Sequence, residues 1–187
     1  MKTPFFYNFF RSIILPLDEI DENVPKGARV VDLGCGEGVV AAYLSKTKGR
    51  TVIGVDLDKK RLPKPLQKNL QFVKSDIRTY SVKNFDAVIL SDVLHHINFP
   101  DQKKILKNIA KNLKKGGTLT IKEIDTGEFV RSKLSRFWDF VLYPNDRICY
   151  WNAKKLRNLL SLLRFKVKII RPCRFFPGST TLFICKK

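Results

Sequence analysis

VVDLGCGEG, residues Val30–Gly38, is the stretch of this sequence that decides the fold. Its apolar, partly β-branched start predicts a buried strand, and glycines at every second position predict a tight turn directly after it. Glycine permits positive φ and lacks the Cβ atom that would hold a ligand away from the backbone. A buried strand that runs through such a turn into a helix is typical of nucleotide-binding α/β sheets.

The glycine spacing separates this loop from two common phosphate-binding motifs. Val39 stands where the dinucleotide fingerprint has its third glycine, and no Gly-Lys-Ser/Thr is present, which excludes a P-loop. Asp32 lies near the carboxyl end of the predicted strand, where open α/β sheets bind ligands. The loop alone therefore indicates a nucleotide-binding turn without naming the nucleotide.

Strand and helix patterns alternate after the loop, which predicts a parallel sheet with right-handed crossovers. Pro63 and Pro65 shorten the helix expected between the second and third strands. Asp101 is expected to cap the next helix, which Gly116 and Gly117 end. The expected strands are Arg29–Leu33, Thr51–Asp58, Asn69–Ser75, Phe85–Leu90 and Thr118–Ile124, with helices from Val39 and over Asp101–Lys115.

The two ends of the chain carry further amphipathic elements. Pro4–Ile20 predicts an aromatic-rich helix that Pro16 kinks or ends; it either packs on its own domain as a lid or lies on a membrane surface. Aromatic and basic residues dominate Gly127–Tyr150. A helix over Asn152–Leu163 and a hairpin-like pair of strands, Phe165–Arg171 and Thr180–Lys186, close the chain.

The length of 187 residues suits a single domain with a full core. We expect an N-terminal helix or lid at 1–23, a cofactor-binding core at 24–125, an acceptor-side insertion at 126–150, and a C-terminal helix and hairpin at 151–187. No signal peptide or transmembrane segment is expected, because the apolar N-terminal run is short and interrupted. The four cysteines show neither paired nor zinc-like spacing, so we expect a cytoplasmic protein and no metal site.

The formal net charge of +19 favours anionic partners such as nucleic acid or an anionic membrane surface. The alternative is that dispersed lysines simply solvate the surface, since they form no long basic run.

Five motifs in order make the chain resemble the class I S-adenosylmethionine-dependent methyltransferases of the small stand-alone type. VVDLGCGEG resembles the family's first motif, VIGVDLD its second acidic motif and FVKSDI its adenine-binding motif, while FDAVILSDVLHHI and LKKGGTLTIKEI resemble the motifs of the fourth and fifth strands. The resemblance implies a Rossmann-like, doubly wound α/β sheet of seven strands, ordered 3-2-1-4-5-7-6 with strand 7 antiparallel.

The same resemblance implies how S-adenosylmethionine, or its product S-adenosylhomocysteine, would be bound. Asp56 would accept both ribose hydroxyls, and Asp76 would accept from the adenine amino group, although Asp76 and Asp92 could equally be plain helix caps. Leu57 and Ile77 would pack against the adenine. The methionine portion would be bound by Asp32, Gly34, Cys35, Gly36 and the backbone carbonyl of Ser91.

A general base is needed only if the methyl acceptor arrives protonated. His95 and His96 follow the fourth strand and Glu123 and Asp125 end the fifth, so these side chains are candidates for binding or deprotonating the acceptor. The fourth-strand motif lacks Asn/Asp-Pro-Pro-Tyr/Phe, and no Pro-Cys nucleophile motif is present, which disfavours methylation of exocyclic amines and of pyrimidine C5.

A small, partly apolar acceptor is the leading expectation, because the two elements expected to set acceptor specificity, Pro4–Ile20 and Gly127–Tyr150, are both aromatic-rich. A membrane lipid or RNA acceptor, and a cofactor-binding module without catalysis, are the alternatives.

Overall fold

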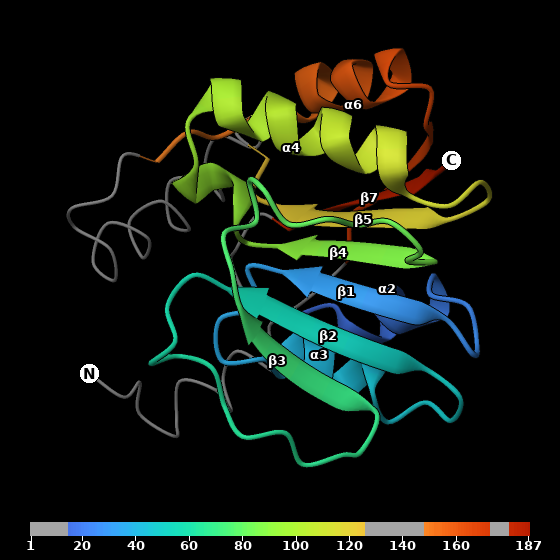
Figure 1. Ribbon diagram of the computed structural model, residues 1–187. Coiled ribbons are helices and arrows are strands. Elements are labelled where there is room, and N and C mark those ends of the chain that lie inside the picture. Colours follow the sequence, from blue (N-terminus) through green and yellow to red (C-terminus); the bar gives the residue numbers. More distant parts are fainter. Residues whose placement is uncertain (1–14, 126–147, 173–179) are drawn as a thin grey trace.

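The computed structural model describes residues 15–125, 148–172 and 180–187, in which seven strands form one sheet with helices on both faces (Figure 1). The strands are β1 (Arg29–Leu33), β2 (Thr51–Asp56), β3 (Leu70–Lys74), β4 (Ala87–Ser91), β5 (Thr118–Glu123), β6 (Lys166–Ile170) and β7 (Thr181–Lys186). The helices are α2 (Leu17–Glu22), α3 (Val39–Leu44), α4 (Phe99–Asn112) and α6 (Ala153–Leu162), with a 3₁₀ turn at Leu94–His96.

The sheet order is β3-β2-β1-β4-β5-β7-β6, as the resemblance implied. The pairs β1–β2, β1–β4, β2–β3 and β4–β5 are parallel, whereas β7 runs antiparallel to both β5 and β6. The carboxyl ends of β1 to β5 consequently meet at one edge of the sheet, which is where open α/β sheets place their ligands.

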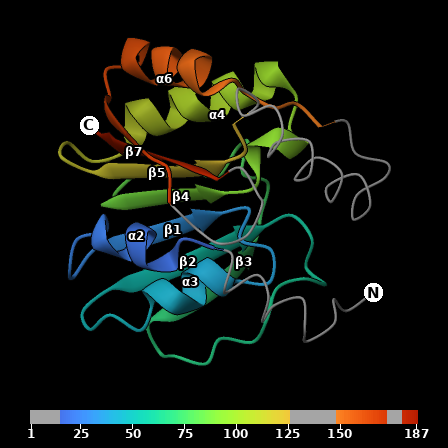
Figure 2. The same ribbon diagram turned by 180° about the vertical axis from the view of Figure 1, so that it is seen from behind.

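Alternate residues of each buried strand supply two separate cores. Val31 of β1 packs in the cluster that includes Leu106 of α4, while its neighbour Val30 packs with Ile20 of α2 and Leu44 of α3. The rear view shows α2 and α3 on the face opposite α4 and α6 (Figure 2). Covering both faces explains why the central strands read as continuous apolar runs rather than as alternating ones.

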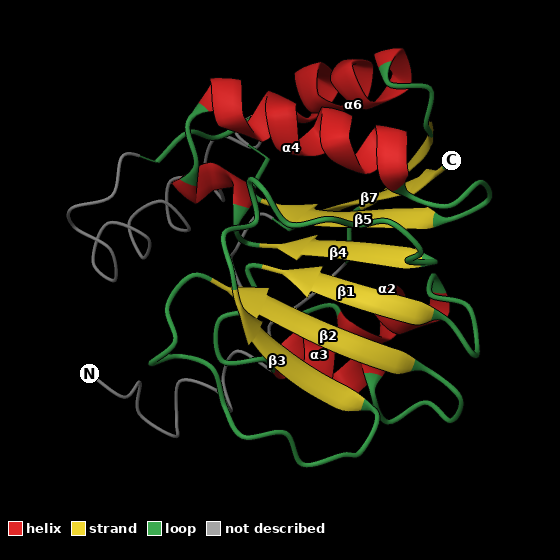
Figure 3. Cartoon of the chain, viewed as in Figure 1, coloured by secondary structure: helices red, strands yellow, loops and turns green. Residues whose placement is uncertain are grey.

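The prediction of a short helix between the second and third strands was wrong. The β2–β3 connection contains turns but no helix, and the β3–β4 connection also lacks an α-helix, as the loop colouring in Figure 3 shows. Pro63 and Pro65 lie in the first of these connections, and each removes a backbone donor and restricts the residue before it. The expected regular alternation of strands and helices therefore holds only on part of the sheet.

The start of helix α4 also differs from prediction. Helix α4 begins at Phe99, two residues before Asp101, because the Asn98 side chain accepts the cap hydrogen bond from the Asp101 backbone. Helix α2 begins at Leu17, directly after Pro16, and contains the last residues of the predicted Pro4–Ile20 helix. The remainder of the predicted Pro4–Ile20 helix, residues 4–14, lies outside the described residues, as does 126–147 of the aromatic insertion.

None of the helices in the described ranges has the length and apolar character to cross a membrane.

Candidate active site

The loop after β1 is fixed by hydrogen bonds to the end of β2. The backbone N–H groups of Gly34 and Cys35 both donate to the Val55 carbonyl, at 2.7 and 3.0 Å. Gly34 has φ of +75°, and a Cβ placed there would lie 2.2 Å from Cγ2 of Val93. Glycine is therefore required at this position both by the backbone conformation and by the close approach of the loop that follows β4.

Asp56 ends β2 with its carboxylate held in place by two backbone donors. Oδ2 accepts from the Gly36 N–H at 2.8 Å and Oδ1 from the Asp58 N–H at 2.9 Å. A Cβ on Gly36 would lie 2.7 Å from Nη2 of Arg61, so the Arg61 guanidinium rests against the glycine loop. The carboxylate and the loop are thus one preorganised unit.

Cys35 contributes backbone rather than reactive sulfur. Its side chain is 8% exposed, and burial, reinforced by the charges of Asp32 and Asp56, raises the pKa of the Cys35 thiol far above its ordinary value. A thiol in that state is not a nucleophile near neutral pH.

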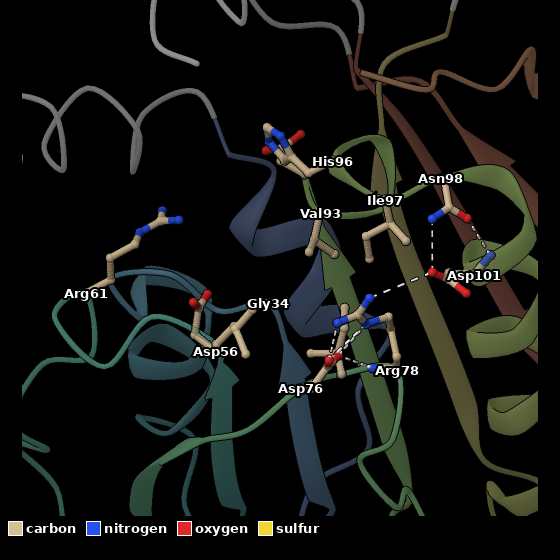
Figure 4. Close-up of a pocket in the computed structure, with 13 residues that line it drawn as sticks. Gly34, Asp56, Arg61, Asp76, Arg78, Val93, His96, Ile97, Asn98 and Asp101 are labelled. Atoms are coloured by element: carbon tan, nitrogen blue, oxygen red, sulfur yellow. Dashed lines mark hydrogen bonds and ion pairs between the residues drawn. The ribbon is translucent and has the colours of Figure 1, made fainter. Parts of the chain in front are cut away.

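A cavity of about 410 Å³ opens where the loops after β1, β2, β3 and β4 meet (Figure 4). This volume lies within the range of roughly 300–1,000 Å³ that is common for small-molecule sites. The lining residues come from all four loops and from the start of α4: Gly34, Asp56, Leu57, Arg61, Asp76, Ile77, Arg78, Asp92, Val93, His96, Ile97, Asn98 and Asp101.

The β3 side of the cavity carries an ion pair. Arg78 donates to Asp76 through Nε, at 3.0 Å to Oδ1 and 2.8 Å to Oδ2, and through Nη2, at 2.5 Å to Oδ2. These hydrogen bonds hold the pKa of Asp76 below its usual value. Ile77 is buried beside the pair, whereas Leu57, from the loop after β2, is 61% exposed. Asp76 does not cap an α-helix, because none follows it in the described β3–β4 connection.

The structure separates the two adjacent histidines. His95 is buried at 2% exposure, and its Nδ1 lies 2.7 Å from Oε2 of Glu123. Its ring also stacks on Tyr150, with 5.4 Å between centroids. Oε1 of Glu123 accepts from the Leu94 N–H at 2.9 Å, so this carboxylate anchors the 3₁₀ turn Leu94–His96 to the end of β5. His96 lines the cavity, and neither His95 nor Glu123 does.

Lys122 holds the same loop from the other face of the sheet. Its Nζ lies 2.5 Å from Oδ1 of Asp92, and its backbone carbonyl accepts from the Asp92 N–H at 3.0 Å. Asp92 has φ of +52°, a left-handed conformation that is uncommon outside glycine. Adjacent strand residues point to opposite faces, so Lys122 and Glu123 clamp the β4–α4 loop from both sides.

Other expected residues lie behind the cavity wall. Asp32 and Ser91 are buried at 1% and 5% exposure, near the ends of β1 and β4, and neither lines the cavity. Asp125 accepts from the Ala153 N–H at 3.1 Å and from Nη2 of Arg171 at 3.2 Å, which places it at the start of α6. No group of three or more His, Cys, Asp or Glu among the described residues is arranged to hold a metal ion.

Sequence reasoning missed Arg61, Arg78, Asn98 and Asp101 as cavity residues, and Lys122 as the support of Asp92. Lys122 carried a signal, since a charged residue inside the apolar run TLTIKEI needs a buried partner. The other four stand in polar loops, where a charged side chain is ordinary and carries no signal.

Comparison with known proteins provides independent evidence on the family of this chain. A family model described as a methyltransferase domain matches residues 7–167. The chain is 32% identical over 108 residues to a ubiquinone biosynthesis O-methyltransferase of Coxiella burnetii, covering 54% of this chain and 45% of that protein. It is 30% identical over 160 residues to the mitochondrial ubiquinone biosynthesis O-methyltransferase of Dictyostelium discoideum, covering 68% and 49%. The chain thus spans about half the length of these curated relatives.

Solved structures share the fold at low sequence identity. A SAM-dependent methyltransferase from Archaeoglobus fulgidus superposes with a TM-score of 0.72 at 18% identity, covering 98% of this chain and 100% of that one. Magnesium protoporphyrin IX methyltransferase from Synechocystis, solved with bound SAH, gives 0.73 at 20% identity, covering 100% and 89%. With the matched domain, the sheet order and the glycine loop in agreement, this chain belongs to the class I S-adenosylmethionine-dependent methyltransferases.

Proposed function

We propose that this protein transfers a methyl group from S-adenosylmethionine to a hydroxyl oxygen of a small, partly apolar molecule. The observation that carries the proposal is one cavity with the Asp56 carboxylate and the glycine loop on one side and the His96 imidazole on another. The two O-methyltransferase relatives named above favour oxygen as the accepting atom.

The residues present fit this cofactor. Gly34 presents bare backbone at the cavity wall and lets the loop pass close to Val93, since a Cβ there would lie 2.2 Å from Cγ2 of Val93. Asp56 presents a carboxylate to the cavity, and the cavity has a volume suited to a nucleoside-sized ligand. Ser91 Oγ, at the end of β4, is buried without a hydrogen-bond partner among the described residues, so this hydroxyl is able to make a further hydrogen bond at this edge of the sheet.

On this proposal the nucleoside is held by the loops after β2 and β3. Asp56 accepts from the ribose hydroxyls, and Asp76 accepts from the adenine amino group. Leu57 and Ile77 cover the two faces of the adenine; the high exposure of Leu57 gives it apolar surface to bury.

The methionine portion lies along the loop after β1. Gly34, Cys35 and Gly36 approach it with their backbone, and Asp32 and the Ser91 carbonyl provide negative charge and an acceptor near its ammonium group.

The cofactor, when bound, supplies an electrophilic methyl group with a good leaving group, so the protein's task is to orient the acceptor, exclude water and manage one proton. His96 is the proposed base, because its ring lines the cavity and imidazole can accept a proton from a hydroxyl near neutral pH. His95 and Glu123 are positioning residues that hold the His96 turn, and Lys122 fixes Asp92 at the start of that loop.

Isothermal titration calorimetry with S-adenosylhomocysteine tests the cofactor assignment. Asp56→Asn keeps the size of the side chain but removes its charge and the acceptor for one of the two backbone N–H groups that hold it. We therefore expect affinity to fall by about tenfold or more, the loss of at least one charge-assisted hydrogen bond. Glu22→Gln, an exposed carboxylate of α2 outside the cavity, is the matched control and should bind as wild type. Equal binding by wild type and Asp56→Asn would reject the assignment.

The acceptor class is tested separately with labelled S-adenosylmethionine and a panel of phenols, catechols, amines and thiols. Labelling confined to amines or thiols would reject transfer to oxygen while leaving the cofactor site intact.

A second candidate acceptor is an anionic macromolecule or lipid, which the net charge of +19 favours. Four exposed lysines stand on α4: Lys103, Lys104, Lys107 and Lys111. Co-sedimentation with anionic vesicles and with RNA at two salt concentrations decides, since a genuine electrostatic association weakens as salt rises.

A further inference from the structure

Asp76, the proposed adenine acceptor, already has both carboxylate oxygens engaged by Arg78. Oδ1 accepts from the Arg78 backbone N–H at 2.9 Å as well as from Nε, while Oδ2 accepts from Nε and Nη2. Figure 4 shows the guanidinium lying against this carboxylate inside the cavity. An incoming amino group must therefore share or displace these donors to reach Asp76.

The same guanidinium has a second carboxylate within reach. Nη1 of Arg78 lies 3.8 Å from Oδ2 of Asp101, across the cavity at the start of α4. Asn98 holds Asp101 by donating to its Oδ2 and accepting from its backbone N–H, both at 3.0 Å. The Arg78 side chain is 52% exposed, so surrounding packing does not confine it to one partner. Arg78 is therefore shared unequally between a near carboxylate and a far one.

We propose that Arg78 competes with the cofactor for Asp76, and that Asp101 receives the guanidinium when the adenine enters. The inference rests on the proposed function, in which Asp76 accepts from the adenine amino group. Moving towards Asp101 keeps the arginine charge paired, so the exchange costs less than leaving Arg78 unpartnered. Ligand binding then shifts a population between two ion pairs, with the affinity set by the difference between them.

The test is calorimetry of S-adenosylhomocysteine with Arg78→Ala, Asp101→Asn and the double variant. Removing the competitor should tighten binding by roughly twofold to fivefold, the scale of one exposed ion pair. Asp101→Asn removes the receiving carboxylate and should weaken binding by a similar factor. In the Arg78→Ala background Asp101→Asn should have no effect, because no guanidinium remains to be received.

Salt gives an independent readout. Raising ionic strength screens the exposed Asp76–Arg78 pair, so wild-type affinity should rise between about 50 mM and 500 mM salt, while Arg78→Ala should show little change. Lys103→Ala, which removes an exposed cation of α4 outside the cavity, is the control for net charge and should retain the salt response.

Weaker binding by Arg78→Ala would mean that Arg78 contacts the ligand directly, and unchanged binding would mean that the ion pair does not compete; either result overturns the inference. Circular dichroism of each variant confirms that it is folded. If Asp56→Asn lowers affinity as expected while Arg78→Ala does not raise it, only this inference fails. If wild type itself does not bind, the proposed function fails with it.

Discussion

Glu123 offers the most direct test of how the cavity wall is supported. This carboxylate is 4% exposed and accepts from two groups that are themselves buried, the Leu94 N–H at 2.9 Å and the His95 ring at 2.7 Å. Glu123→Ala leaves both without this acceptor. A buried polar group left unsatisfied costs about 1–3 kcal/mol, so the two together predict a loss of roughly 2–6 kcal/mol in the free energy of unfolding.

Glu123→Gln separates the two contacts. The amide oxygen can still accept from the Leu94 N–H, and the amide nitrogen can donate to His95 Nδ1 if the imidazole carries its proton on the other nitrogen. We therefore expect a smaller loss of about 1–2 kcal/mol. The ordering alanine, then glutamine, then wild type in increasing stability is the prediction.

Urea denaturation followed by far-UV circular dichroism measures these differences, with Glu22→Gln as the control for an exposed carboxylate. An Ala variant within about 0.5 kcal/mol of wild type, the range of ordinary surface substitutions, would refute the reasoning. A Gln variant of wild-type stability that has lost all methyl transfer would instead make Glu123 a direct participant in proton transfer.

Three further predictions concern the glycine loop, the proposed base His96, and the buried Arg50 that directly precedes β2. Gly34→Ala should cost about 1–3 kcal/mol and weaken cofactor binding, because its φ of +75° is strained for alanine and its Cβ meets Val93 at 2.2 Å; adding Val93→Ala should recover part of the stability but not the backbone strain. His96→Asn should lower kcat on hydroxyl acceptors by roughly 10²–10⁴ with little change in S-adenosylhomocysteine affinity, whereas His95→Asn should lower stability. An unchanged kcat for His96→Asn would exclude it as the base. Arg50→Met should destabilise the fold by about 1–3 kcal/mol, because the buried Arg50 side chain pairs with Asp21, which is 30% exposed, and donates to the Val24 and Pro25 carbonyls, which would lose a donor. Urea midpoints equal to wild type would contradict this.

Hydrophobic periodicity was sufficient to place the strands along the chain, whereas their order in the sheet was implied by the family resemblance. Apolar runs bounded by turn residues predicted all seven strands to within two residues at every end, and the five ordered motifs implied the observed strand order. The helix predicted in the β2–β3 connection is absent, because Pro63 and Pro65 disfavour a helix more strongly than strand–helix alternation favours one. The sequence did not distinguish Asn98 from Asp101 as the cap of α4, because both residue types are favoured at a helix N-cap.

The sequence by itself determined a buried strand that ends in a glycine turn and an acid at the end of the next strand, because these are local features. The fold and the cofactor class followed from the family resemblance that five ordered motifs carry. Only the tertiary structure decided which of the two adjacent histidines faces the cavity. Successive residues of the 3₁₀ turn point in different directions, so His95 contacts Glu123 while His96 lines the cavity. The tertiary structure also placed Arg78 between Asp76 and Asp101, which are 25 positions apart and meet because the loop after β3 and the start of α4 converge at one edge of the sheet. Such meetings depend on long-range packing, which no local pattern records.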